Sequence, residues 1–400
     1  MSIRVLIVLF FALSGALSAS AQSVEAKFST ERPNYLVGEP LFVTLAVSNK
    51  TSEPIWLEFQ SPDLDKLLCD DFAVEVQGAA PAEPPWGCGF AGSCGRGLRE
   101  VLPGESTSLR QLVNQRFRLQ AGAYSLHAQT SIGVRKKDLW DSPEVERVKV
   151  SDTLQVRVQR GNRSQLESAF NPLVTELKNP DPVRQAEAAA AITELAPAFL
   201  EDLIIELTNT RFSGSAVIAL RKANTPKTRA ALARIASGRG DSMLRIAAID
   251  NLGRSRDIAY LPTLFELMES AEKPIENAAA SAAGTLGGPE AIARLSTFVS
   301  SADAEKRISG ANGLGRSHAR QAVPILIGLL LDPDSNVRQE VVSSLWLLTH
   351  HAALDGNEWA DISTVESGAA VHQRWVNWWS SRGTSCEIHG MADCFSPEPL

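Results

Sequence analysis

Residues 323–338 read VPILIGLLLDPDSNVR, and this stretch decides the fold of the C-terminal half of the chain. It opens with an apolar run of helical period that carries a proline, Pro324, near its start. A polar turn follows, and Asp334 then precedes a second helical stretch that contains Arg338. Proline is tolerated in the first turn of a helix, where its missing amide has no partner to lose. The stretch therefore predicts two short helices joined by a tight turn.

The same unit recurs along the chain with a period of about 30 residues. Leucines occupy its equivalent positions, which are Leu220, Leu252, Leu286, Leu314 and Leu345. Prolines recur near the start of the other helix, at Pro226, Pro262, Pro289 and Pro324. Three of the leucines precede a glycine that we expect to close its helix in a left-handed turn, namely Gly253, Gly287 and Gly315. Such a period predicts a stack of helix pairs, each packed on its neighbours.

A second recurrence pairs an aspartate with an arginine three or four residues later. The pairs are Asp181 with Arg184, Asp241 with Arg245, Asp303 with Arg307, and Asp334 with Arg338. Aspartate is a favoured helix cap, and the arginine can bond an aspartate or the carbonyls of the adjacent repeat. We interpret these residues as a structural ladder rather than as a catalytic or anion-binding site.

Together these recurrences resemble HEAT repeats, in particular the short bacterial class also found in phycobilisome-lyase subunits. The resemblance covers residues 164–351, about six helix pairs, although the unit at 210–224 lacks the aspartate and the pair near Pro274 lacks both the aspartate and the arginine. It implies an all-α superhelical solenoid with an extended groove.

The apolar period is two, not helical, from residue 22 to residue 160. Leu41, Val43, Leu45 and Val47 alternate with Phe42, Thr44, Ala46 and Ser48. This period predicts about seven antiparallel strands that cover one core as a β-sandwich. The stretches at 35–41 (YLVGEPL) and 117–126 (FRLQAGAYSL) resemble strands of bacterial immunoglobulin-like domains. That resemblance implies an all-β immunoglobulin-like fold for 22–160.

The two periods meet at residues 160–163. Ser164 followed by Glu167 predicts a capping box that opens the first helix. We expect two independent domains on either side, with few contacts between them.

The first 21 residues predict a signal peptide. Arg4 precedes a short apolar run, Val5–Leu13, and Ala19-Ser20-Ala21 forms a cleavage site before Gln22. The run is too short to cross a bilayer core, which needs roughly twenty residues. We expect an exported protein, periplasmic or extracellular, with no transmembrane segment after cleavage.

Export places the five cysteines in an oxidising compartment. The short spacings predict bridges Cys88–Cys94 and Cys386–Cys394 and leave Cys69 unpaired, although Cys69 could instead pair with Cys88 or Cys94. Cys386, His389 and Cys394 offer three zinc ligands without an evident fourth, so we expect no metal site.

Composition and motifs exclude several function classes. The formal net charge is −7 and the sequence contains no basic run, so nucleic acid is not an expected partner. The sequence has no G-x-S-x-G, P-loop or H-E-x-x-H motif. We therefore expect no catalytic residues, no cofactor and no enzyme activity. The oligomeric state stays open.

Residues 352–400 contain a tryptophan cluster in a predicted last helix. Trp375, Trp378 and Trp379 share one helix face, which would cover the apolar end of the stack. The alternative is a platform on which sugars stack.

These patterns favour a non-catalytic scaffold or assembly factor that binds a protein or peptide through the solenoid groove and the sandwich loops. Two alternatives remain. One is an enzyme or enzyme subunit related to the bilin-lyase HEAT proteins. The other is a carbohydrate or cell-wall binder that uses the tryptophan cluster.

Overall fold

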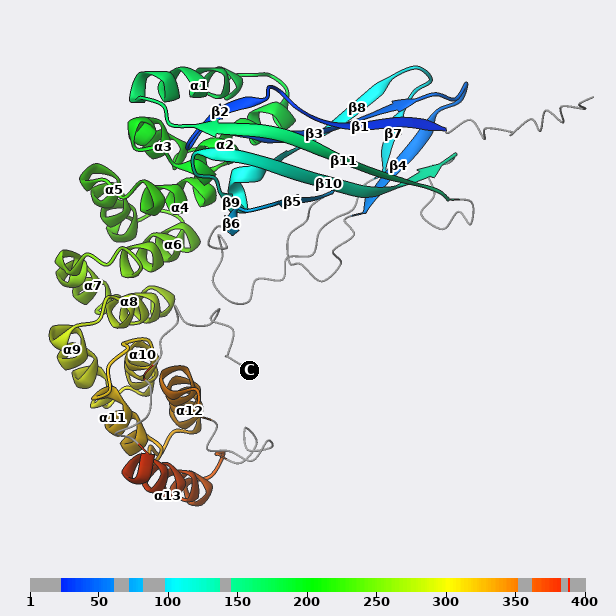
Figure 1. The fold of residues 1–400 in the computed structure, drawn as a ribbon. Helices are drawn as coiled ribbons and strands as arrows, with labels where there is room; N and C mark the ends of the chain where they lie inside the picture. The colour runs from blue at the N-terminus through cyan, green and yellow to red at the C-terminus, as the bar shows by residue number, and fades with distance from the viewer. Residues whose placement is uncertain are drawn as a thin grey trace, which may run out of the picture.

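The computed structural model describes residues 23–60, 72–81, 98–136, 145–351, 362–382 and 388. A β region comes first and a region of thirteen α-helices follows it, so the predicted order of the two regions is confirmed (Figure 1). The proposed signal peptide and all five cysteines lie outside the described residues. No helix in the described ranges has both the length and the apolar character needed to cross a membrane.

Two sheets build most of the β region. The first has the order β1 (Val24–Thr30), β3 (Phe42–Asn49) and β8 (Ser106–Leu112). The second has the order β2 (Asn34–Leu36), β11 (Glu146–Gln159), β10 (Gly122–Arg135), β4 (Ile55–Gln60) and β7 (Arg99–Val101). Strand β5 (Ala73–Val76) also pairs with β10. A two-stranded sheet joins β6 (Ala80–Pro81) to β9 (Phe117–Arg118). A short 3-10 helix, Val113–Gln115, follows β8.

One buried cluster fills the space between the two sheets and includes Phe28, Leu45, Leu57, Leu126 and Ile132. The expectation of antiparallel strands alone was wrong, because β2 runs parallel to the end of β11. The amide of Arg157 donates to Pro33 O at 2.8 Å, and the amide of Val37 donates to Gln159 O at 2.9 Å. The segment between β1 and β3 therefore gains partners for its backbone by lying along β11.

The helices form six successive pairs and a last single helix. The first helices of the pairs, called outer helices here, are α1 (Arg163–Glu176), α3 (Glu201–Leu207), α5 (Pro226–Ser237), α7 (Leu261–Leu267), α9 (Pro289–Val299) and α11 (Ala322–Leu329). The second helices, called inner helices, are α2 (Pro182–Leu195), α4 (Ser213–Ala223), α6 (Ser242–Gly253), α8 (Lys273–Leu286), α10 (Ala304–Gly315) and α12 (Ser335–Thr349). The last helix is α13 (Val365–Arg382), and 3-10 turns precede α3 and α7. The stack is curved, with the inner helices on its hollowed side (Figure 1).

Small residues let consecutive inner helices pack at short range. A Cβ on Gly253 would lie 2.8 Å from Ala282 Cα, and one on Gly315 would lie 2.6 Å from Ser344 Cβ. Both glycines are the last residues of their helices, and each is followed by a residue with negative φ. The prediction of left-handed turns at Gly253 and Gly315 was therefore wrong, and Gly287 alone of the three has a positive φ, of 72°. Close approach of helices, not turn geometry, explains the other two.

A capping box opens α1, two residues before the predicted one. The Asn162 side chain accepts from the Gln165 amide at 2.9 Å, and the Gln165 side chain accepts from the Asn162 amide at 2.9 Å. The assignment to Ser164 and Glu167 was wrong because asparagine caps a helix as well as serine does. The chain enters the helix before Ser164 is reached.

The β region and the helices share an apolar core. Phe42 and Leu112, 6% and 7% exposed, belong to the same buried cluster as Phe170 and Ile192 of the helical region. Phe42 and Leu112 therefore make an apolar contact across the boundary, and the independence of the two domains stays a prediction. Phe42 lies among the residues that were assigned to the polar side of β3, and it packs against the first helices, whereas Ala46 on the same side is exposed. The core thus fixes the two regions against each other.

Candidate functional site

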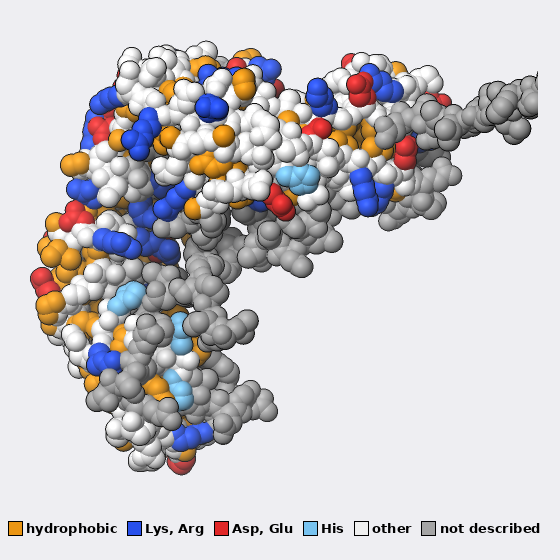
Figure 2. Space-filling view, viewed as in Figure 1, with side chains coloured by type: hydrophobic (Ala, Val, Ile, Leu, Met, Phe, Trp, Pro, Cys, Tyr) orange, Lys and Arg blue, Asp and Glu red, His pale blue; other side chains and the backbone are white. Residues whose placement is uncertain are grey.

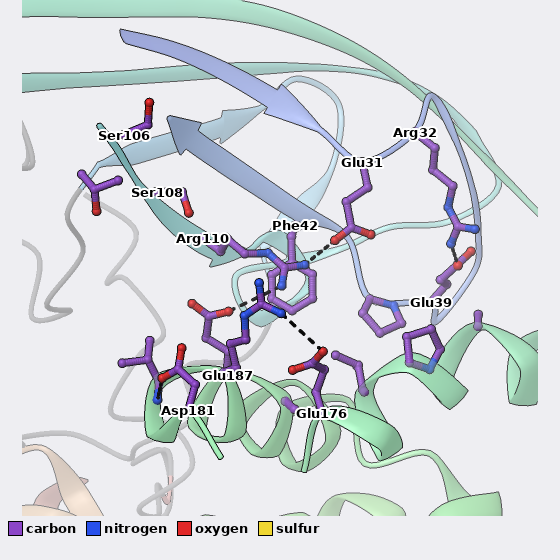
Figure 3. A pocket seen from close by; sticks show the side chains of 18 of the residues that line it. Glu31, Arg32, Glu39, Phe42, Ser106, Ser108, Arg110, Glu176, Asp181 and Glu187 are labelled. Carbon is purple, nitrogen blue, oxygen red and sulfur yellow. Dashed lines mark hydrogen bonds and ion pairs between the residues drawn. The ribbon is translucent and has the colours of Figure 1, made fainter. Parts of the chain in front are cut away.

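A cavity of about 1020 Å³ lies where the two regions meet, and we call it the junction cleft (Figure 3). One wall is formed by the β region, with Phe42 on β3 and Arg110 on β8. The other is formed by α1 and α2, from which Glu176 and Glu187 reach the cleft. Because the shared core holds both walls, the cleft is a fixed feature of the fold.

Arg110 connects the two walls. Its guanidinium lies over the Phe42 ring, 4.2 Å from the ring centroid. The same group pairs with Glu31 on the β side and lies 3.5 Å from Glu187 Oε2 on α2. Burial raises the pKa of the Glu187 carboxyl, and the nearby Arg110 opposes that rise. These contacts order the middle of the cleft.

The helical wall combines acidic and apolar surface. Asp181 caps α2, since its Oδ1 accepts from the Val183 amide at 2.9 Å. Arg184 Nη1 lies 3.7 Å from Glu176 Oε1. Val183 also lines the cleft and is 58% exposed. The wall thus offers an apolar contact beside charged groups.

The β wall presents the edge of a sheet. Strand β8 ends its sheet in the part of the chain that the structure describes. Asn49 N donates to Glu105 O at 3.0 Å and Val113 N donates to Leu41 O at 2.9 Å, so odd-numbered residues of β8 bond β3. The backbone groups of Ser106, Ser108 and Arg110 consequently point away from β3, toward the edge.

Arg99 occupies one point of that edge. Its Nη1 donates to Ser108 O at 3.1 Å and to Thr107 Oγ1 at 3.0 Å. Ser106, Thr107 and Ser108 line the cleft together with Arg99. The edge therefore offers backbone and hydroxyl groups that an extended chain can bond.

The carboxylates of the cleft are engaged in ion pairs or capping: Glu31 with Arg110, Glu176 with Arg184, and Asp181 with the α2 amide. Glu39 likewise pairs with Arg32 and accepts from the Leu36 amide at 2.7 Å. Among the described residues, no group of three His, Cys, Asp or Glu side chains is arranged to hold a metal.

The aspartates of the predicted ladder cap inner helices. Asp181, Asp241, Asp303 and Asp334 precede α2, α6, α10 and α12, and each accepts a hydrogen bond from a first-turn amide. These aspartates lie 31 to 62 residues apart in the sequence and do not converge on one site.

The arginines of the ladder reach other partners than their own aspartates. Arg245 Nη1 lies 2.6 Å from Glu272 Oε1, and Arg307 makes two bonds, of 2.7 and 2.9 Å, to Asp332. Arg338, 1% exposed, donates to four carbonyls, those of Asp332, Pro333, Ile362 and Ser363. Arg184 contacts Glu176 at the cleft. Arg245, Arg307 and Arg338 thus each link their own helix to the segment just before the next inner helix or α13.

The tryptophan cluster packs against the end of the stack. Trp375 is 1% exposed, and Trp378 and Trp379 are half-buried against the helical core. The His351 ring stacks on Trp378 with centroids 4.0 Å apart and an angle of 6°. A ring as buried as that of Trp375 has no free face for a sugar.

Sequence reasoning missed the residues that build the cleft. Phe42 was visible as an apolar residue on the polar side of an alternating strand, and that was a signal for a second interface. Arg110, Val183 and Glu187 carry no such signal, since each is ordinary for its strand or helix.

No family model matches this chain, and no curated protein matches it. Three solved structures illustrate its structural likenesses. An engineered protein is 21% identical over 44% of this chain and 94% of its own, with a TM-score of 0.28. Human deoxyhypusine hydroxylase in complex with glycerol is 15% identical over 53% and 97%, with a TM-score of 0.25. The complex of CpcE and CpcF of phycocyanin lyase from Nostoc sp. is 16% identical over 54% and 84%, with a TM-score of 0.28. Because these TM-scores are below 0.5, we draw no functional conclusion from them.

Proposed function

We propose that this chain is a non-catalytic scaffold or assembly factor that binds a protein or peptide. The observation that carries the proposal is the junction cleft, whose two walls come from different regions and are fixed by a shared apolar core. A preformed cleft binds with a smaller entropic cost than one that must first be assembled. The inner helices continue from it as an extended surface.

A polypeptide suits this cleft because of what its walls offer. The edge of β8 presents backbone donors and acceptors, which an added strand satisfies along its length. Val183 on the opposite wall provides an apolar contact, and the ion pairs around Arg110 set a polar border. A small rigid ligand would use only part of such an elongated lining.

The architecture that we propose is an immunoglobulin-like sandwich followed by a HEAT-like solenoid. Two sheets around one core support the first part, and recurrent capped helix pairs support the second. We also propose export to the periplasm or the extracellular space, on the strength of the pattern in residues 1–21. The buried Trp375 speaks against the sugar-binding alternative.

The test is affinity capture from envelope extract with residues 22–400 as bait. A second bait carries Val183→Glu, which places a charge in the cleft at an exposed position near the start of α2. We expect wild-type bait to enrich one or a few proteins that the variant fails to enrich. Equal enrichment by both baits, or turnover of a substrate by the purified chain, would contradict the proposal.

A further inference from the structure

The inner helices run parallel, so their ends meet at two edges of the groove. Near their starts, Ser242 bonds Glu272 at 3.2 Å and Lys273 bonds Asp303 at 3.1 Å. Near their ends, Lys222 bonds Glu194 and Arg221 bonds Asn251 at 2.8 Å. In successive repeats, the amino ends of the inner helices therefore contact each other, and so do their carboxyl ends. One edge of the groove is formed by the carboxyl ends of all inner helices.

Basic residues gather at this edge, which we call the basic rim. In the last turn of each described inner helix and the loop after it, the cations are Arg221, Lys222, Arg254, Arg256, Arg316 and Arg320. The carboxylates there are Glu194, Asp250 and Asp257, and they pair with Lys222, with Arg254 and with Arg229 of α5, respectively. Exposed His318 and His350 belong to the same edge. The rim is positive in a chain whose net charge is −7.

Figure 2 shows this distribution on the face in view. Lys, Arg and His side chains gather along the hollowed side of the helical stack, and few Asp or Glu side chains appear there. The opposite edge carries the capping aspartates and Glu272, several of them in ion pairs with the next repeat. Cations at helix ends and carboxylates at helix starts both suit the helix dipole. The edge at the helix ends is therefore positive, while the edge at the helix starts carries both signs, since Arg245, Lys273 and Arg307 lie there as well.

The linear sequence hides the basic rim. It contains no basic run, and its composition gave no reason to expect a positive surface. The rim forms because the ends of α4, α6 and α10, which lie far apart in the sequence, reach the same edge of the groove.

We propose that the basic rim binds an extended acidic segment of a partner protein. Successive packed helices lie about 8–10 Å apart, and an extended chain rises about 3.3 Å per residue. A partner carboxylate at about every third residue would therefore meet the cations at the ends of α4 and α6 in turn, and one about two repeats further along would reach those of α10. This inference rests on the proposed binding function and adds the chemistry of the partner.

An acidic peptide fits the rim better than a nucleic acid does. Glu194 and Asp250 interrupt the row of cations, and a peptide can place neutral residues opposite them. A nucleic acid carries a phosphate at every nucleotide and would bring some of them against these carboxylates. The experiment must therefore distinguish binding of an acidic peptide from binding of a nucleic acid.

The experiment uses residues 22–400 and three fluorescent probes at low ionic strength. The first is a fifteen-residue peptide with glutamate at every third position among serine and glycine. The second has lysine in place of glutamate, and the third is a fifteen-nucleotide oligothymidine. The rim variant is Arg254→Gln with Arg256→Gln. The matched control, Arg234→Gln with Arg239→Gln, removes the same charge from exposed residues at the end of α5 and just before α6.

We expect the acidic peptide to bind, the lysine peptide not to bind, and the rim variant to weaken binding roughly tenfold. The control variant should bind as wild type does, and added salt should weaken binding because it screens exposed charges. No binding of the acidic peptide, equal loss in both variants, or tighter binding of oligothymidine would overturn the proposal. If the acidic peptide fails while capture at the cleft persists, the rim proposal alone is wrong.

Discussion

The guanidinium of Arg110 lies 4.2 Å from the ring centroid of Phe42, and the two residues join the halves of the molecule. Phe42 is buried in the helical core although it belongs to strand β3. Arg110, on β8, pairs across the cleft with Glu187 of α2. The fold of the β region is thereby coupled to the first helix pair, and the cleft between them is held open by buried apolar contact.

Phe42→Ala should destabilise both regions at once. Removing a buried aromatic ring costs about 3–5 kcal/mol, and this ring belongs to the core that both regions share. Chemical denaturation followed by circular dichroism should show earlier loss of helix as well as strand. Leu102→Ala, at a position 45% exposed, should change stability by no more than about 0.5 kcal/mol. A helical transition unaffected by Phe42→Ala would mean that the cores are separate.

Two helical glycines should respond in opposite directions to alanine. Gly315→Ala places a Cβ 2.6 Å from Ser344 Cβ and should cost about 1–3 kcal/mol through overpacking. Gly328, within α11, has no atom within 4 Å of its added Cβ. Gly328→Ala should therefore stabilise the protein by about 0.5–1 kcal/mol. Thermal unfolding of the two variants compares them directly, and a shift of the same sign in both would argue against close helix approach.

Much of the fold could be predicted from the sequence because the period of the apolar residues and the recurrence of the leucines directly reflect which side chains are buried. Leu220, Leu252, Leu314 and Leu345 are fully buried, and Leu286 is partly buried against the same core. What could not be predicted is how closely elements approach. A glycine after a helical leucine fits a left-handed turn and a close contact equally well, so Gly253 and Gly315 were misassigned.

The candidate site was harder to predict than the fold for the same reason. The junction cleft depends on which side of β3 faces α1 and α2, and local alternation does not contain that information. The basic rim depends on the alignment of helix ends across repeats. Both features combine residues that are distant in sequence, so only the assembled chain brings them together.

Arg338→Met should strongly loosen the end of the stack. The buried Arg338 donates to four carbonyls, two of which, Ile362 and Ser363, lie just before α13. Loss of these bonds leaves buried acceptors without partners and should cost about 3 kcal/mol or more. Arg184→Met is the matched control, because its side chain is 63% exposed and its ion pair should contribute at most about 1 kcal/mol. Equal unfolding midpoints for the two variants would contradict this role of Arg338.

Glu340→Gln should stabilise the protein at neutral pH and lose that advantage in acid. Burial raises the pKa of the Glu340 carboxyl above its usual value, while bonds from Asn312 and Ser344 partly oppose the rise. Below the usual carboxyl pKa the group is protonated in both folded and unfolded chains, so its ionisation costs nothing. As the pH rises through the usual and then the raised pKa, burial of the charge destabilises the folded form. Unfolding midpoints measured from pH 4 to pH 8 should therefore diverge, and a constant difference would refute this assignment.

The most direct test of the account measures the dissociation constant of a captured partner for two variants. Val183→Glu places a carboxylate in the junction cleft, and Val365→Glu places one at a site 51% exposed at the start of α13, just after the capping residue Thr364. Both change an exposed valine near the start of a capped helix, so their effects on folding should match. We predict that Val183→Glu weakens binding at least tenfold while Val365→Glu leaves it unchanged. Equal dissociation constants for the two variants would contradict the proposal that the cleft is the binding site.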